Sequence, residues 1–162
     1  MALTAEQREP LIRRYADGPA LLEAALAKVP DSARLWRPAP GKWSAHEVVC
    51  HCADSEMNAA ARIRYVVAES SPTIQGYDQD RWAQALDYST HPLDAALAMV
   101  RAARGNTVPL LRRLPEEAWR RTGHHTESGA YSSEIWLQAY AEHLEVHARQ
   151  IERNLAAWQA AG

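Results

Sequence analysis

Residues 133–159, which read SEIWLQAYAEHLEVHARQIERNLAAWQ, decide the fold of this chain. Apolar side chains recur in this stretch every three or four residues, a period that is typical of a helix with one buried face. The apolar residues on this face are Trp136, Tyr140, Leu144, Ile151, Leu155 and Trp158. His143 and His147 lie on the same face. The stretch therefore predicts a long core helix that buries two imidazole rings.

The spacing of these two histidines suits a metal site. Residues four apart in a helix lie one turn apart, with Cβ atoms about 5 to 6 Å from each other. Two imidazoles at this distance can bind one metal ion. Polar rings buried among apolar side chains need polar partners of some kind.

A second predicted helix carries a third inward histidine. Ser44 and Glu47 form a capping box at its start, and His51 and Ser55 share its apolar stripe. The apolar residues of that stripe are Val48, Cys52, Ile63 and Val66. Three imidazoles from two helices predict a tripod for a divalent metal ion that leaves coordination positions open, as catalysis requires.

Local signals place the remaining helices. Thr4 and Gln7 form a capping box that begins the first helix, and Gly18-Pro19 predicts a kink within it. Pro92 is expected at the first position of the third helix, after a cap at Thr90 or His91.

The fourth helix, which contains the histidine pair, is expected to begin after a cap at Ser132 or Ser133 and to run to about Gln159. The preceding segment, Thr122 to Gly129, is expected to be a loop.

The second and third helices are joined by a long connection. Ser70-Ser71-Pro72 ends the second helix, Thr73 to Asp80 forms a polar crossing segment, and a short helical piece follows near Arg81 to Leu86. No strand pattern competes with the helical one. We therefore expect an all-α fold, a four-helix bundle with a long connection between helices 2 and 3, as a single domain over residues 1–162.

Composition excludes several classes of partner. The formal net charge of −2 provides no cluster of Lys and Arg for nucleic acid. The sequence has no apolar run long enough to span a membrane and no signal peptide, so we expect a cytoplasmic protein that binds neither nucleic acid nor membrane. Cys50 and Cys52 point to nearly opposite sides of one helix and are expected to be reduced thiols.

Several stretches together resemble one known family. They are Trp43-Ser44, His51-Cys52-Ala53-Asp54-Ser55, Pro72-Thr73-Ile74, Tyr77-Asp78, Trp82 and His143-x-x-x-His147. Over roughly residues 5 to 158 the chain resembles the DinB-like superfamily, and within it the YfiT-like branch. The resemblance implies a four-helix bundle, a divalent metal held by the three matching histidines and a homodimer.

The same resemblance implies the chemistry. Members of the superfamily include enzymes that use bacillithiol or mycothiol and proteins described as metal-dependent hydrolases. We expect a thiol S-transferase in which zinc or nickel, bound by His51, His143 and His147, activates a low-molecular-weight thiol toward a small electrophile. Asp54 and Tyr140 are the catalytic candidates: Asp54 to orient a ligand or bound water, Tyr140 to hydrogen-bond the substrate.

Tyr77, Asp78 and Arg81 of the crossing segment are expected to contact the small-molecule substrate or the thiol. Adjacent histidines at 124 and 125 are expected to be solvated loop residues, and His46 to point away from the site.

Two alternatives to the transferase remain open. In the first, the same tripod activates water in a metal-dependent hydrolase. In the second, the metal only stabilises a non-catalytic helical binding protein.

Overall fold

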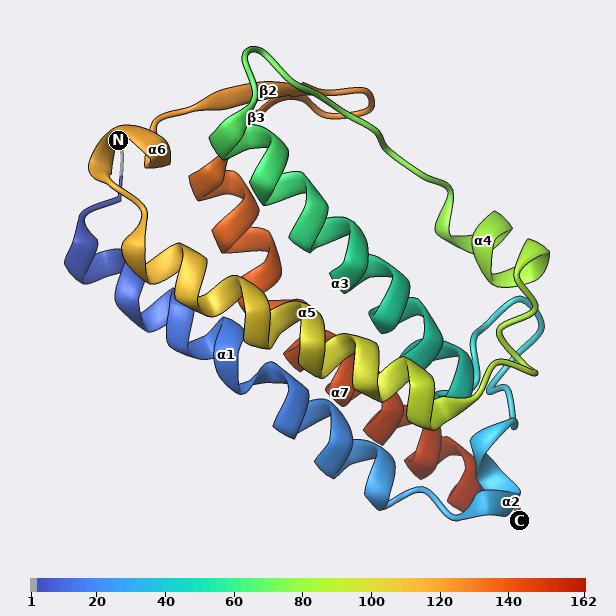
Figure 1. The fold of residues 1–162 in the computed structure, drawn as a ribbon. Coiled ribbons are helices and arrows are strands. Elements are labelled where there is room, and N and C mark those ends of the chain that lie inside the picture. Colours follow the sequence, from blue (N-terminus) through green and yellow to red (C-terminus); the bar gives the residue numbers. More distant parts are fainter. Residues whose placement is uncertain (1–2) are drawn as a thin grey trace.

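A computed structural model, which describes residues 3–162, confirms the four-helix bundle (Figure 1). Within these residues the long helices are α1 (Ala5–Ala27), α3 (Ala45–Ala68), α5 (Leu93–Arg113) and α7 (Ser133–Ala161). Helix α1 packs mainly on α7, and α3 packs on both α5 and α7. Met1 and Ala2, where the predicted domain begins, lie outside the described part.

The predicted capping signals begin three of these helices. Capping boxes at Thr4 and Ser44 start α1 and α3, and the Ser132 side chain accepts a hydrogen bond from the backbone N–H of Ile135 at the start of α7. The expectation for α5 was wrong by one residue: Pro92 is the capping residue, and its extended backbone places the first helical residue at Leu93.

Within the described residues, three short helices lie in the connections: α2 (Asp31–Arg34), α4 (Gln79–Ala85) and α6 (Glu116–Trp119). Helix α4 is the predicted helical piece of the long connection, and the Asp78 side chain caps it by accepting from the backbone N–H of Arg81 at 3.0 Å. No helix in residues 3–162 is long and apolar enough to cross a membrane.

The prediction that the chain has no strands was wrong. The described residues contain a small sheet in which β1 (Thr73–Ile74) runs parallel to β2 (Thr122–His125), and β2 pairs antiparallel with β3 (Gly129–Ser132). The segment expected as a loop is therefore half of a hairpin. Strands of two to four residues are too short to show a period-2 pattern, and their pairing depends on tertiary contacts between distant segments.

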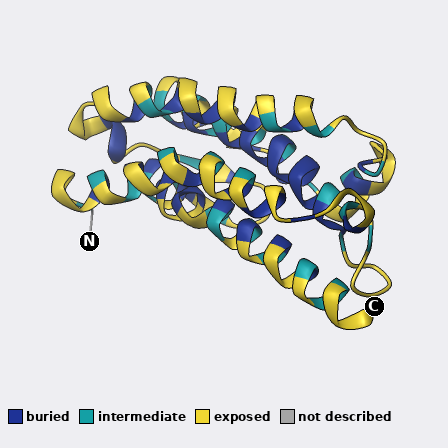
Figure 2. Cartoon of the chain, turned by 90° about the horizontal axis from the view of Figure 1, so that it is seen from below, coloured by how far each residue is buried: buried dark blue, intermediate teal, exposed yellow. Residues whose placement is uncertain are grey.

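Two apolar clusters form the core of the part that the structure describes, and Figure 2 shows buried residues on the sides of the helices that face one another. One cluster lies toward α2 and is mainly aliphatic; its members include Leu22, Val48, Cys52, Val100, Leu144 and Ile151. The other lies toward the sheet and is rich in aromatic rings; it includes Tyr15, Ile63, Leu111, Trp119, Trp136 and Tyr140. Each long helix passes from one cluster to the other, and buried polar residues occupy the level between them.

Candidate metal centre

His51 of α3 and His143 and His147 of α7 come together, as the sequence predicted. One ligand atom from each ring lies within 4.8 Å of the others. The ring centroids are 5.7 Å apart for His51 and His143, 4.8 Å for His51 and His147, and 4.6 Å for His143 and His147. The last pair follows from helical spacing, whereas His51 joins it because α3 packs against α7.

The surroundings keep two of these rings uncharged at neutral pH. Burial, together with smaller contributions from the neighbouring His147 and His143, lowers the pKa of His51 to about 2. Burial also lowers the pKa of His147 to about 4, with a smaller contribution from His143. A neutral imidazole keeps a lone pair available, which a metal ligand requires.

Hydrogen bonds determine which nitrogens are free. Nδ1 of His143 lies 3.0 Å from Oε1 of Glu56, and Nδ1 of His147 lies 2.8 Å from Oε1 of Gln150. Because these oxygens accept, each Nδ1 donates its proton and Nε2 keeps its lone pair. The buried Nδ1 of His51 has no hydrogen-bond partner within residues 3–162. Three imidazoles gathered at these distances fit a divalent ion such as zinc or nickel.

The predicted catalytic residue Asp54 lies on α3, and its Oδ2 accepts a hydrogen bond from the Tyr88 hydroxyl at 2.6 Å. The structure thus gives its carboxylate a tyrosine partner from the connection that precedes α5.

Tyr140 is buried beside the cluster, with its ring 5.5 Å from that of His143. Its hydroxyl accepts a hydrogen bond from Nη1 of Arg62 at 3.2 Å, and Arg62 also donates to the backbone of Gln75 at 2.7 Å. Sequence analysis missed Arg62, although it lies eleven residues after His51, on the same side of α3.

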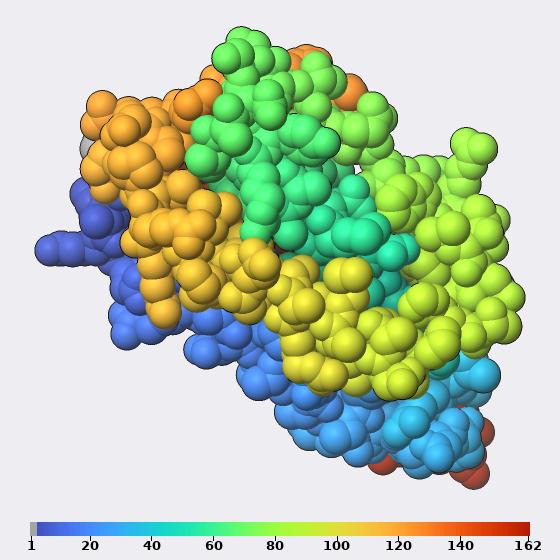
Figure 3. All heavy atoms as spheres, in the orientation of Figure 1, coloured from blue at the N-terminus to red at the C-terminus, as the bar shows by residue number. Residues whose placement is uncertain are grey.

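Tyr77, Asp78 and Arg81 line one cavity of about 690 Å³ together with Asp54. The cavity lies between α3 and the crossing segment, and Figure 3 shows these two parts of the chain side by side on the surface. Tyr77 packs against Trp82 with ring centroids 4.4 Å apart, which adds an aromatic wall. The structure therefore brings the three predicted residues of the crossing segment to one cavity, whereas Tyr140 lies outside its lining.

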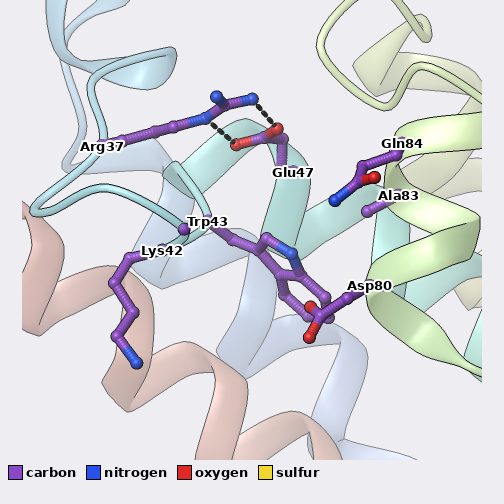
Figure 4. Close-up of a pocket in the computed structure, with 8 residues that line it drawn as sticks. Arg37, Lys42, Trp43, Glu47, Asp80, Ala83 and Gln84 are labelled. Atoms are coloured by element: carbon purple, nitrogen blue, oxygen red, sulfur yellow. Dashed lines mark hydrogen bonds and ion pairs between the residues drawn. The ribbon is translucent and has the colours of Figure 1, made fainter.

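A smaller pocket of about 270 Å³ lies on the other side of α4 (Figure 4). The ion pair between Arg37 and Glu47 lies across this pocket from Asp80 and Gln84 of α4. Its wall includes Trp43, whose ring centroid is 4.7 Å from that of His51. Trp43 thus joins this pocket to the histidine cluster.

Sequence analysis also missed the buried ion pair of Glu56 and Arg104, which are 0% and 1% exposed. Burial alone would raise the pKa of Glu56, but the hydrogen bond with His143 and the charge of Arg104 outweigh it and hold the pKa below its usual value. The available signal was a charged residue on each apolar stripe: Glu56 follows Cys52 by four residues, and Arg104 follows Val100 by four.

The remaining histidines lie outside the cluster. Nε2 of His46 is 2.8 Å from the carbonyl oxygen of His91, as expected for a ring that points away. The expectation that His125 is solvated was wrong, because β2 places it in the sheet with 7% exposure. His124 is exposed.

Comparisons with known proteins agree with this architecture. The model of the DinB superfamily matches residues 14–151. A protein of Oceanobacillus iheyensis named "Putative metal-dependent hydrolase OB0782" is 35% identical over 111 residues, which cover 68% of this chain and 64% of that protein. The chain thus spans slightly less than two thirds of that relative.

"Putative metal-dependent hydrolase YfiT" of Bacillus subtilis (strain 168) is 26% identical over 161 residues, which cover 95% of this chain and 89% of that protein. Its solved structure, described as having an unusual four-helix bundle topology, matches 94% of this chain and 88% of its own with a TM-score of 0.87. A mycothiol-dependent maleylpyruvate isomerase matches with a TM-score of 0.62 at 16% identity, over 94% of this chain and 61% of its own, and shows a shared fold.

Proposed function

This chain belongs to the DinB superfamily, and from that membership and the histidine cluster we propose that it is a divalent-metal enzyme that transfers a low-molecular-weight thiol to a small electrophile. The observation that carries the proposal is the convergence of His51, His143 and His147 from two helices. Two comparisons support it. A relative is named "Putative metal-dependent hydrolase YfiT", and a mycothiol-dependent isomerase shares the fold.

In this proposal the three histidines hold zinc or nickel, both of which accept imidazole ligands. A bound divalent ion would lower the pKa of a coordinated thiol or water. Glu56 accepts a hydrogen bond from Nδ1 of His143, and Gln150 accepts one from Nδ1 of His147. These bonds leave Nε2 of each ring as the atom that would bind the metal.

The reacting thiol must come from a separate molecule. Cys50 and Cys52 are both free and buried. Burial raises the pKa of Cys50 to about 12 and raises that of Cys52 as well, so neither forms a thiolate at neutral pH.

The cavity beside α4 is the proposed binding site for the substrate or the thiol. Its Tyr77–Trp82 wall offers apolar surface, while Asp54, Asp78 and Arg81 offer charged groups. Ser55 connects this cavity to the cluster. Its Oγ is 3.3 Å from Nε2 of His143, and its hydroxyl partly offsets the rise in the pKa of Tyr77 that burial causes.

Tyr140 is proposed to hydrogen-bond the reacting group. Burial raises its pKa, so its hydroxyl stays protonated and can donate, while Arg62 partly offsets that rise. Asp54 is proposed to orient a ligand in the cavity, with its carboxylate fixed by Tyr88. We further propose that the protein acts as a cytoplasmic homodimer.

Hydrolysis by metal-activated water is the second candidate, favoured by the names of the relatives. One experiment separates the two functions. Metal-loaded protein is given a chromogenic electrophile with bacillithiol, mycothiol, cysteine or glutathione, and separately a chromogenic ester without thiol, each with and without chelator.

The transferase predicts consumption of thiol and electrophile together, abolished by chelator and by His143→Ala but retained in His46→Ala. Thiol-independent ester turnover that the chelator abolishes would assign the hydrolase instead. A metal-loaded protein inactive in both assays would contradict both functions and leave the non-catalytic alternative.

A further inference from the structure

A buried ion pair lies directly behind His143. Arg104 of α5 donates to Glu56 of α3 through Nε at 2.9 Å and through Nη2 at 2.6 Å. The oxygen that accepts from Nη2, Oε1, is also 3.0 Å from Nδ1 of His143. The orientation of the His143 ring therefore depends on the position of Arg104.

Helix α1 contains a binding position for the guanidinium of Arg104. In a regular helix the carbonyl of Tyr15 would accept from the N–H of residue 19, but residue 19 is proline and has no N–H. Nη1 of Arg104 donates to this carbonyl instead, at 2.5 Å. A proline in the middle of α1 thus supplies the acceptor that the arginine needs.

Gly18 supplies the space. A Cβ atom at this position would collide with Nη1 of Arg104 and would lie 3.0 Å from Cβ of Leu144. Glycine and proline are both unfavourable inside helices, yet α1 continues through Gly18-Pro19 without a break. Gly18-Pro19, which the sequence predicted to be a kink, is therefore the place on α1 where the buried Arg104 binds.

All parts of the guanidinium are engaged. Nη2 also donates to the carbonyl of Tyr140 on α7 at 3.0 Å, and the Cζ atom lies 4.1 Å from the centre of the Tyr15 ring. Arg104 thereby contacts α1, α3 and α7 from α5. It cannot rotate without leaving buried polar groups unpaired, which is costly.

We propose that Glu56 and Arg104 are positioning residues of the metal centre and that Gly18-Pro19 holds them in place. Glu56 accepts the Nδ1 proton of His143, which leaves the lone pair of Nε2 for a metal ion shared with His51 and His147. Hydrophobic residues can replace a buried ion pair with little loss of stability, so stability alone gives weak reason for this arrangement. The inference rests on the metal site of the proposed function and names the residues that orient one of its ligands.

The first test needs no variant. Long-range ¹⁵N–¹H spectra of the metal-free wild-type protein report which ring nitrogen of His143 carries the proton. We expect the Nδ1–H tautomer, assigned by comparison with His143→Ala. A proton on Nε2 would overturn the inference.

The second test compares two glycines. Gly18→Ala displaces Arg104, whereas Gly105→Ala on α5 adds a Cβ in open space. We measure Zn²⁺ affinity by competition with a chromogenic chelator and record the absorption spectrum of the Co²⁺ form. Gly18→Ala is expected to weaken affinity by roughly 10- to 100-fold, the range for residues that support metal ligands, and to change the Co²⁺ spectrum. Gly105→Ala leaves both unchanged.

Glu56→Gln should match Gly18→Ala, and neither change should weaken affinity further in a His143→Ala background. Circular dichroism checks that the variants are folded. If folded variants keep the wild-type Zn²⁺ affinity and Co²⁺ spectrum, this inference is overturned but the proposed function is not. A wild-type protein that binds neither ion would overturn the proposed function with it.

Discussion

His51 and His125 are both buried histidines with lowered pKa values, yet their surroundings differ. Nδ1 of His125 accepts from the backbone N–H groups of Glu127 and Ser128, at 3.2 and 3.4 Å, and the ring packs on an aromatic neighbour. Nδ1 of His51 has no partner among residues 3–162, and two other imidazoles surround the ring. Burial therefore does not distinguish the two roles. The two rings differ in hydrogen bonding, because the turn at residues 125–128 satisfies Nδ1 of His125, whereas Nδ1 of His51 stays unpaired in the described part of the chain.

The largest difference between the two residues should appear in metal content. His51→Ala removes one of the three proposed ligands, so bound zinc or nickel should fall from about one ion per chain to background. His125→Ala should keep wild-type content. Elemental analysis of untagged protein, after reconstitution and dialysis, gives the answer. If both variants lose bound metal equally, the loss comes from disturbed folding and not from the removal of a ligand.

A smaller difference should appear in the pH dependence of stability without metal. The unfolded state protonates His51 below its ordinary pKa of 6.5, whereas the folded state keeps it neutral down to about 2. The free energy of unfolding therefore falls as the pH drops below 6.5, by about 2 kcal/mol at pH 5 for this residue. Urea titrations in chelator at pH 7 and 5 should show this loss reduced in His51→Gln. A wild-type protein equally stable at both values contradicts it.

The smallest effect concerns His125 itself. Its replacement by alanine leaves the two backbone N–H groups of the turn without their acceptor and should cost about 1 to 2 kcal/mol of unfolding free energy. The cost should be the same with and without metal, since this ring lies outside the cluster. A metal-dependent cost, measured by thermal unfolding of both forms, would instead couple the sheet to the metal centre.

Much of the fold could be predicted because the signals are local. Capping boxes at Thr4 and Ser44 and the 3.6-residue period identify helices from neighbouring residues alone. The inward faces of His51, His143 and His147 followed from the same period, so the histidine cluster could be anticipated once a bundle was assumed.

Other features had no local signal. In the β1–β2 pairing, Thr73 lies opposite His124, which is 51 positions later in the sequence. Glu56 and Arg104 are separated by 48 residues, and their partner Tyr15 lies on a third helix. In the sequence His125 looks like any loop histidine, because strands this short have no local pattern that would mark the sheet around it.

The sequence by itself determined the helices, their buried faces and the set of histidines that points inward, because helical periodicity is a property of residues three and four positions apart. The tertiary structure decided which of these histidines is left without internal partners and how the His143 ring is oriented. Those outcomes depend on hydrogen bonds among four helices, and such bonds form only after packing has brought Gly18, Glu56 and Arg104 to one level of the core.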